Sequence, residues 1–144
     1  MLRELLTIGY QGREPAELVA ALEQHGVDVL VDVRDKPISR KRGFSKRALE
    51  ELLSAHGMGY VHARGLGNPK TNRDAGGGVP TVLSNYEAWM AERWDDAFLP
   101  LRPVVDDKRV CLLCLERDPQ DCHRTIVARE MVARLGAGAL RHLP

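Results

Sequence analysis

The side chains with the most chemical potential lie close together in the stretch LCLERDPQDCHR, residues 113–124. It holds two cysteines, Cys114 and Cys122, with Glu116 and His123 nearby. A thiolate can act as a nucleophile or a metal ligand, and glutamate or histidine can exchange a proton with a substrate. We therefore take Cys114, Glu116, Cys122 and His123 as candidate catalytic residues.

The position of Cys122 favours a nucleophilic role. It follows Asp121, which can cap a helix predicted to begin there, and a helix N-terminus carries a partial positive charge. That charge and the adjacent His123 would lower the pKa of the Cys122 thiol, whereas the carboxylate of Asp121 opposes its ionisation. Cys114 shares a strand face with Glu116 and is the second candidate. The alternative is that both cysteines are packed, unreactive core residues.

A metal site is the second chemistry that cysteines suggest. Cys111 and Cys114 form a C-x-x-C pattern, but they lie inside a predicted strand, where residues three apart point to opposite faces. Cys114, Cys122 and His123 can supply three ligands if the intervening loop folds back. Structural zinc sites normally show a second paired group of ligands, which this chain lacks. The sequence therefore predicts no metal site, and it identifies no cofactor.

Another set of side chains suits an anion. Arginine binds phosphate or carboxylate in a two-pronged geometry, and tyrosine can stack on a base or hydrogen-bond a sugar. The alternative for Arg34 is an internal ion pair with Asp32, which shares its strand face, since buried charges require partners. The candidate residues for binding a substrate anion are Tyr10, Arg34, Ser39, Arg40, Tyr60 and Arg124.

The elements that must position these residues alternate between strands and helices. The glycine-rich residues 64–81 are expected to form a mobile loop within the domain. Strands are expected at residues 5–10, 27–34, 58–62, 109–116 and 139–143. Helices are expected to begin at Pro15, Ser45, Ser84 and Asp121, where Ser84 and Glu87 would form a capping box for a helix carrying Trp89 and Trp94.

This alternation predicts an α/β fold. We expect a single domain over residues 1–144, with an open, mostly parallel sheet of about five strands and helices on both faces, in a Rossmann-like three-layer arrangement. In such sheets ligands bind beyond the carboxyl ends of the strands. Most of the candidate residues fall at those ends, so the sequence predicts one site at that edge.

The composition is that of a globular protein. Apolar residues make up 44% and charged residues 28% of the 144 positions, and the net charge of +1 indicates no partner by itself. The opening residues, MLRELLTIGY, are too short and too mixed for a signal peptide or a membrane span. Three cysteines without such a signal suit reduced thiols. We therefore expect a cytoplasmic protein with no membrane partner, and the oligomeric state stays open.

Four motifs occur in order along the chain: TIGYQG, VDVRDKPISRKRGFS, GYVHARGLGNP and LLCLERDPQDCHR. Through them, from Thr7 to about His142, the chain resembles the family catalogued as domain of unknown function 488. The resemblance implies a single α/β domain and no established activity, and it leaves Cys111 outside the pattern. It places motif positions on Gly9, Tyr10, Asp32, Arg34, Pro37, Ser39, Arg40, Phe44, Tyr60, Leu66, Gly67, Cys114, Glu116, Cys122, His123 and Arg124.

The leading hypothesis is a hydrolase or transferase that acts on a phosphorylated small molecule or a nucleotide at this edge. Arg34, Arg40 and Arg124 would hold the anion, while the mixture of acid, base and thiol exceeds what a binding surface requires.

A nucleic-acid-binding module is the first alternative. Residues 34–47 hold seven basic residues and one acid, Asp35, an excess of six positive charges, and Phe44 or Tyr60 could stack on bases. The low net charge and the 5% share of aromatic residues argue against it. The second alternative is a zinc-stabilised regulatory domain.

Overall fold

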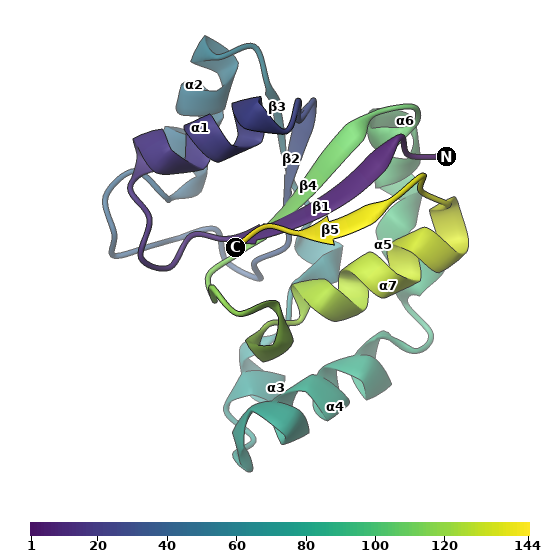
Figure 1. Cartoon of the computed structure of the whole chain (residues 1–144). Coiled ribbons are helices and arrows are strands. Elements are labelled where there is room, and N and C mark those ends of the chain that lie inside the picture. The colour runs from purple at the N-terminus through teal and green to yellow at the C-terminus, as the bar shows by residue number, and fades with distance from the viewer.

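Five parallel strands form one open sheet in the computed structural model, which describes all 144 residues of the chain (Figure 1). The strand order is β3-β2-β4-β1-β5. This confirms the predicted α/β class and strand number, and the open sheet is consistent with a Rossmann-like arrangement. The strands are β1 (Glu4–Gly9), β2 (Val29–Asp32), β3 (Gly59–His62), β4 (Arg109–Cys114) and β5 (Leu140–His142).

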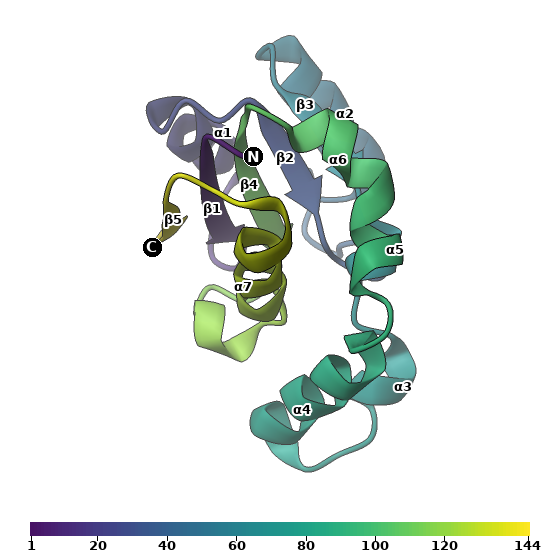
Figure 2. The same ribbon diagram turned by 90° about the vertical axis from the view of Figure 1, so that its right-hand side faces the viewer.

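Helices cover both faces of this sheet. The helices α1 (Pro15–Gln24) and α2 (Lys46–Ala55) pack on one face, where Leu18 and Leu49 join a buried cluster with Leu30. The helices α5 (Trp94–Phe98), α6 (Arg102–Val105) and α7 (Arg124–Leu135) cover the other face (Figure 2). There Phe98 and Met131 join a second buried cluster with Val31 of the sheet. The two apolar clusters explain the predominantly apolar sequences of β1, β2 and β4, since strands covered on both faces are apolar at nearly every position.

Alternation along β4 separates two of the cysteines. Cys111 belongs to the cluster under α1 and α2, whereas Cys114 belongs to the cluster under α5 and α7. The prediction that the C-x-x-C pair points to opposite faces is therefore confirmed.

The segment between β3 and β4 differs from the prediction. Residues 64–81 were expected to form a loop, but they contain a 3-10 turn at Arg64–Leu66, the short helix α3 (Lys70–Arg73) and the start of α4 (Gly78–Met90). The predicted capping box is wrong, because Ser84 and Glu87 lie inside α4, which begins after Gly77 in a left-handed conformation (φ 88°). Trp89 lies in α4 and Trp94 begins α5, so one expected helix is in fact two.

The start of α7 also differs from the prediction. Asp121 does not cap this helix, because it ends a 3-10 turn at Pro119–Asp121, in which the Asp118 side chain accepts a hydrogen bond from the Gln120 N–H. His123 occupies the N-cap position of α7 instead. Cys122 thus lies between the turn and the helix, and its side chain turns back toward the end of β4.

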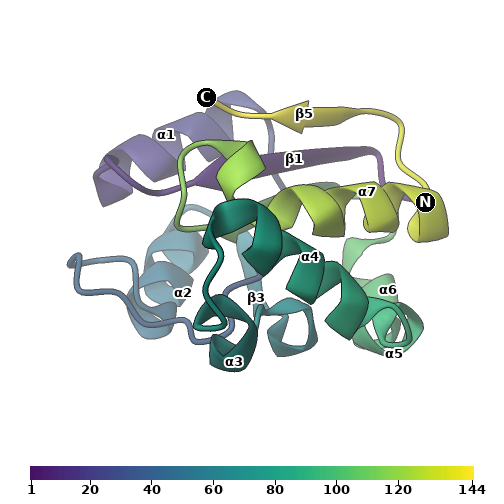
Figure 3. The same ribbon diagram turned by 90° about the horizontal axis from the view of Figure 1, so that it is seen from below.

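The carboxyl ends of β1 and β4 leave no gap between them. The connections from these two strands run in opposite directions across the sheet, which is where an open α/β sheet usually binds its ligand. Here the main chain after β4 crosses the end of β1, so a Cβ on Gly9 would lie 1.8 Å from the Glu116 carbonyl oxygen. The open space lies beside this crossing, at the ends of β2 and β4. The helices α3 and α4 extend beyond this edge of the sheet (Figure 1) and lie in front of it when the molecule is seen from below (Figure 3). None of the helices combines the length and the apolar composition that crossing a bilayer requires.

Candidate functional site

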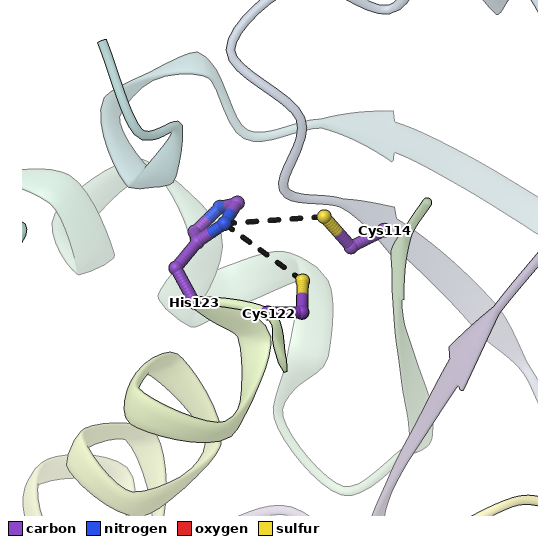
Figure 4. Close-up of side chains that lie close together, drawn as sticks. All are labelled: Cys114, Cys122 and His123. Atoms are coloured by element: carbon purple, nitrogen blue, oxygen red, sulfur yellow. Dashed lines mark hydrogen bonds between the residues drawn. The ribbon is translucent and has the colours of Figure 1, made fainter. Parts of the chain in front are cut away.

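Three buried side chains meet where β4 ends and α7 begins, and we call them the Cys–Cys–His cluster (Cys114, Cys122 and His123; Figure 4). The sulfur atoms of Cys114 and Cys122 each lie 3.9 Å from the Nδ1 atom of His123. All three potential ligand atoms lie within 4.8 Å of one another. The loop of residues 115–121 therefore folds back in the way that the metal alternative required.

The ring of His123 is fixed by its surroundings. Its Nε2 atom lies 2.7 Å from the carbonyl oxygen of Val33, and only a protonated Nε2 can form that hydrogen bond. The ring of Tyr86 packs beside the imidazole, and the centroids of the two rings lie 4.9 Å apart. In the neutral imidazole, Nδ1 must then carry the lone pair, and this lone pair faces the two sulfur atoms.

The protonation of the two thiols differs. Burial disfavours a thiolate at Cys122, but hydrogen bonds from Cys114 and His123 and the charge of His123 outweigh it and lower the pKa of Cys122 well below the ordinary thiol value. The backbone N–H of Arg124 also donates to this sulfur over 3.5 Å. The hydrogen bond to Cys122 and then burial raise the pKa of Cys114. Burial opposes protonation of His123, yet the interaction with Cys122 raises its pKa. The cluster thus favours a thiolate at Cys122 more than an ordinary cysteine does, and a protonated ring at His123 more than an ordinary histidine does, because their pKa values shift in opposite directions.

Glu116 lies at the edge of the cluster. Its Oε2 atom accepts a hydrogen bond from the Cys114 sulfur over 3.5 Å. Burial, and then the negative charge of Cys122, raise the pKa of its carboxyl group above the ordinary value. A glutamate tuned in this direction is suited to proton transfer near neutral pH.

Two adjoining hollows, of about 370 and 330 Å³, open beside the cluster, and we call them together the edge pocket. Asn68, Arg73, Glu116 and His123 line both of them, Cys122 lines only the first, and Tyr10, Arg34 and Cys114 are among those lining only the second. Volumes of this size accommodate a small-molecule ligand.

Asn68 is the polar residue of this pocket that sequence reasoning missed. It is 4% exposed, and its Oδ1 atom is buried without any hydrogen-bond partner. Such atoms are rare in proteins, because an unsatisfied buried acceptor is costly, so each one needs an explanation. The signal in the sequence was the motif GYVHARGLGNP, in which Asn68 directly precedes Pro69. Arg73 lies outside the sequence motifs, so no pattern in the sequence indicated that it lines the pocket. Its Nε donates to the Asn68 carbonyl oxygen over 3.2 Å.

The arginine at the end of β2 is internally paired, as the alternative in the sequence analysis held. Arg34 donates from Nε to Asp32 Oδ1 (2.9 Å) and from Nη2 to Asp32 Oδ2 (2.6 Å), and both side chains are buried. Its Nη1 donates to the carbonyl oxygen of Phe44. The hydroxyl of Tyr60 also donates to Asp32, over 2.6 Å, and Tyr60 does not line the edge pocket. Arg34 therefore borders the pocket, but its guanidinium already donates to Asp32 and to the Phe44 carbonyl oxygen within the chain.

The remaining candidate residues lie away from the pocket. Arg124 is fully buried, and it donates to the carbonyl oxygens of Glu116 and Arg117 and to Thr7 Oγ1. Ser39 and Arg40 lie in the loop before α2, where the Ser39 N–H donates to Ser45, and Arg40 is exposed. The structure therefore brings together six of the ten candidate residues around the pocket: Tyr10, Arg34, Cys114, Glu116, Cys122 and His123.

Comparison with known proteins gives one match. The model of a family described as a domain of unknown function, DUF488, matches residues 14–131, which is most of the chain. No curated protein and no solved structure matches the chain significantly. The first motif of the sequence analysis, TIGYQG, precedes the matched residues.

Proposed function

Because the chain belongs to the DUF488 family, whose description names no activity, we propose a function from the site itself. The protein is an enzyme, a hydrolase or a transferase, that acts on a small phosphorylated or nucleotide-like molecule in the edge pocket. The observation that carries this proposal is the convergence of Cys114, Glu116, Cys122 and His123 on one pocket. A thiol of lowered pKa, an imidazole and a carboxyl group of raised pKa together exceed what binding alone requires.

Each part of the pocket has a role in this proposal. The Cys–Cys–His cluster is the reaction centre, and Glu116 transfers a proton to or from the reacting group. Asn68 Oδ1 accepts a hydrogen bond from an N–H or O–H group of the substrate, which supplies the partner that this buried atom lacks.

The positive charges that favour an anion are Lys36 and Arg73. Both line the pocket, and neither forms an ion pair with a carboxylate, whereas Arg34 is neutralised by Asp32. Arginine can bind a phosphate through two parallel hydrogen bonds, and Arg73 uses only its Nε within the chain. The anionic part of the substrate therefore belongs near Lys36 and Arg73, rather than at Arg34, Arg40 or Arg124.

The nucleic-acid alternative has weaker support. Phe44, which would have to stack on a base, is fully buried, with its ring 4.6 Å from that of Tyr10. Tyr60 donates its hydroxyl to Asp32, and Arg34 is buried. The basic stretch thus offers exposed charges without an exposed aromatic platform, whereas single-strand binding normally combines both.

The experiment that tests this function is a substrate screen on the purified full-length chain. Nucleoside mono-, di- and triphosphates and sugar phosphates are incubated with the protein, and products are separated by chromatography alongside an assay for inorganic phosphate. We expect turnover of at least one compound, with losses in Glu116→Gln and His123→Gln. The matched control is Arg40→Ala, an exposed position outside the pocket, which should retain activity. Equal turnover by all three variants would assign the activity to a contaminant and refute the proposal.

A further inference from the structure

The Cys–Cys–His cluster also has the donor set and the shape of a metal centre. We propose that Cys114, Cys122 and His123 bind one zinc ion whose fourth coordination position opens into the edge pocket. This inference rests on the proposed function and deepens it, because it names the group that would activate water in the same site. It departs from the expectation of the sequence analysis that the chain holds no metal.

The distances in the cluster are close to those that zinc would impose. With Zn–S bonds of about 2.3 Å and Zn–N bonds of about 2.05 Å, tetrahedral angles place sulfur about 3.6 Å from nitrogen and about 3.8 Å from the second sulfur. Both sulfur atoms lie 3.9 Å from His123 Nδ1, and all three atoms lie within 4.8 Å of one another. Side-chain shifts of a few tenths of an ångström would bring the two S–N distances to the values that zinc requires. The two sulfur atoms, which lie no more than 4.8 Å apart, would also have to approach each other by up to about 1 Å, which small rotations about the Cα–Cβ bonds can supply.

The hydrogen bonds around the cluster suit metal ligands. Metal-binding histidines almost always donate their second ring nitrogen to a carbonyl or carboxylate oxygen, and His123 donates Nε2 to Val33 in this way. The same bond directs the Nδ1 lone pair toward the sulfur atoms. At Cys122 the backbone N–H of Arg124 donates to the sulfur, which stabilises a thiolate ligand.

The donor types select among metals. Two thiolates and one imidazole are soft to borderline ligands that suit zinc and other late transition metals, whereas magnesium and calcium require oxygen ligands. Structural zinc sites use four protein ligands, whereas catalytic sites use three and leave one position for water or substrate. A cluster of three that borders a pocket belongs to the second type.

The pocket contains a partner for such a water molecule. Glu116 reaches the rim of the cluster, with Oε2 3.5 Å from the Cys114 sulfur, and its carboxylate can take a proton from a water molecule held there. In the hydrolytic step, a zinc-bound water gives one proton to Glu116, and the resulting hydroxide oxygen forms a bond to the phosphorus or carbon of the substrate. The bond from that atom to the leaving group breaks, and Glu116 returns the proton to the leaving group.

The first test uses the full-length protein and needs no substrate. The chain is stripped with a chelator, refilled with zinc or cobalt(II), and analysed by elemental analysis and absorption spectroscopy. We expect about one equivalent of metal per chain, and for cobalt the intense near-ultraviolet charge-transfer band of thiolate ligands. A wild-type chain that binds well under one equivalent, or that lacks the thiolate band, overturns the proposal without relying on any variant.

Variants assign the ligands. Cys114→Ser, Cys122→Ser and His123→Gln should each weaken zinc binding by more than the roughly 10- to 100-fold lost when a residue hydrogen-bonded to a metal ligand is changed. Cys111→Ser is the matched control, because Cys111 is a buried cysteine on the same strand that faces the opposite side of the sheet, and it should bind zinc like the wild type. Unchanged affinity in all three ligand variants overturns the assignment.

Glu116→Gln separates this inference from the proposed function. This variant should bind one equivalent of zinc and lose turnover, because Glu116 moves a proton and does not hold the ion. If the stripped wild-type chain turns over substrate as fast as the zinc-bound chain, the metal has no part in the reaction and the proposal falls, while the proposed enzyme function stands.

Discussion

His123 and Val33 are joined by a hydrogen bond of 2.7 Å between the imidazole Nε2 and the backbone carbonyl oxygen. This bond connects the beginning of α7 to the residue that follows β2. It determines which ring nitrogen can meet the two thiols, and so a backbone group just beyond the sheet orients a side chain ninety residues away along the chain.

The metal-free cluster should contain one reactive thiol. Because hydrogen bonds and the charge of His123 lower the pKa of Cys122, its alkylation rate in chelator-treated protein should reach half its maximum well below the free-thiol value of about 8.5. The measurement is the rate of iodoacetamide modification at each cysteine against pH, by mass spectrometry. Burial raises the pKa of Cys111, so this thiol should react only after unfolding and serves as the internal control. A midpoint for Cys122 at or above the ordinary value would contradict the thiolate assignment.

The ion pair between Asp32 and Arg34 should be essential for stability. Arg34→Met leaves the Asp32 carboxylate buried and without its charged partner, which costs about 3–5 kcal/mol of the free energy of unfolding. The double variant Asp32→Asn with Arg34→Met should recover a large part of this loss, since no isolated charge remains. Urea unfolding measures all three, with Arg40→Met as the exposed control, expected within about 0.5 kcal/mol of the wild type. A small effect of Arg34→Met would favour the original hypothesis that Arg34 is kept for an anion.

Asn68 should lower the free energy of unfolding of the protein while contributing to turnover in the edge pocket. Asn68→Leu keeps a similar volume and removes the unsatisfied Oδ1, whose burial costs about 1–3 kcal/mol. The free energy of unfolding, measured in urea, should therefore be unchanged or higher than in the wild type, while turnover in the substrate screen falls. A loss of stability would show that Oδ1 has a partner in solution, such as an ordered water molecule, and would remove the argument for a ligand donor.

The sequence indicated where the candidate site lies more completely than which residues line it. Cys114, Glu116, Cys122 and His123 could be identified because a strand end and a helix start adjacent in sequence must also be adjacent in space. Asn68 comes from a distant segment that folds under the sheet edge, and spacing along the chain contains no information about that approach. Spacing also does not say whether an arginine binds a ligand or the backbone. Arg124 was expected to bind an anion, but it donates to the carbonyl oxygens of Glu116 and Arg117.

The last strand should make stability depend on pH through His142. Partial burial of the ring, and then the charge of Arg124, lower the pKa of His142, whose Nδ1 lies 2.7 Å from Thr7 Oγ1. Thr7 accepts from Arg124, so its hydroxyl proton is free to point toward a neutral His142. Because the folded-state pKa is below the unfolded value of about 6.5, this contribution is full above that value and is lost as the pH falls through the folded-state value.

Thermal unfolding of His142→Gln measures this contribution. Between about pH 8 and about pH 5 the wild-type melting temperature should fall more than that of the variant, because only the wild type gains a proton at this position on unfolding. Taking the difference between the two proteins cancels His123, whose raised pKa acts with the opposite sign. Parallel curves for the two proteins would show that His142 has the same pKa in both states.

Gly9 should be irreplaceable because the backbone of Glu116 and Arg117 passes directly over it, and not because of its own backbone conformation. A Cβ at this position would lie 1.8 Å from the Glu116 carbonyl oxygen and 2.9 Å from Arg117 Cα, both of which are backbone atoms that no rotamer change can move. The loop cannot shift freely either, because the Gln11 N–H donates to the Leu115 carbonyl oxygen over 2.9 Å and Arg124 donates to the next two carbonyls.

Gly9→Ala should therefore lower the free energy of unfolding by about 1–3 kcal/mol or more, which is the usual cost of overpacking a core. It should also displace Glu116 from the pocket. Gly65→Ala is the matched control, since its Cβ would meet Ala97 at an ordinary 3.5 Å and its backbone needs no left-handed conformation. Urea unfolding and turnover in the substrate screen measure the two effects, and we expect Gly65→Ala to behave like the wild type in both. Suppose that Gly9→Ala is as stable and as active as Gly65→Ala. The close approach of residues 116 and 117 to the end of β1 would then not hold Glu116 in place, and the position of its carboxylate in the pocket would need another cause.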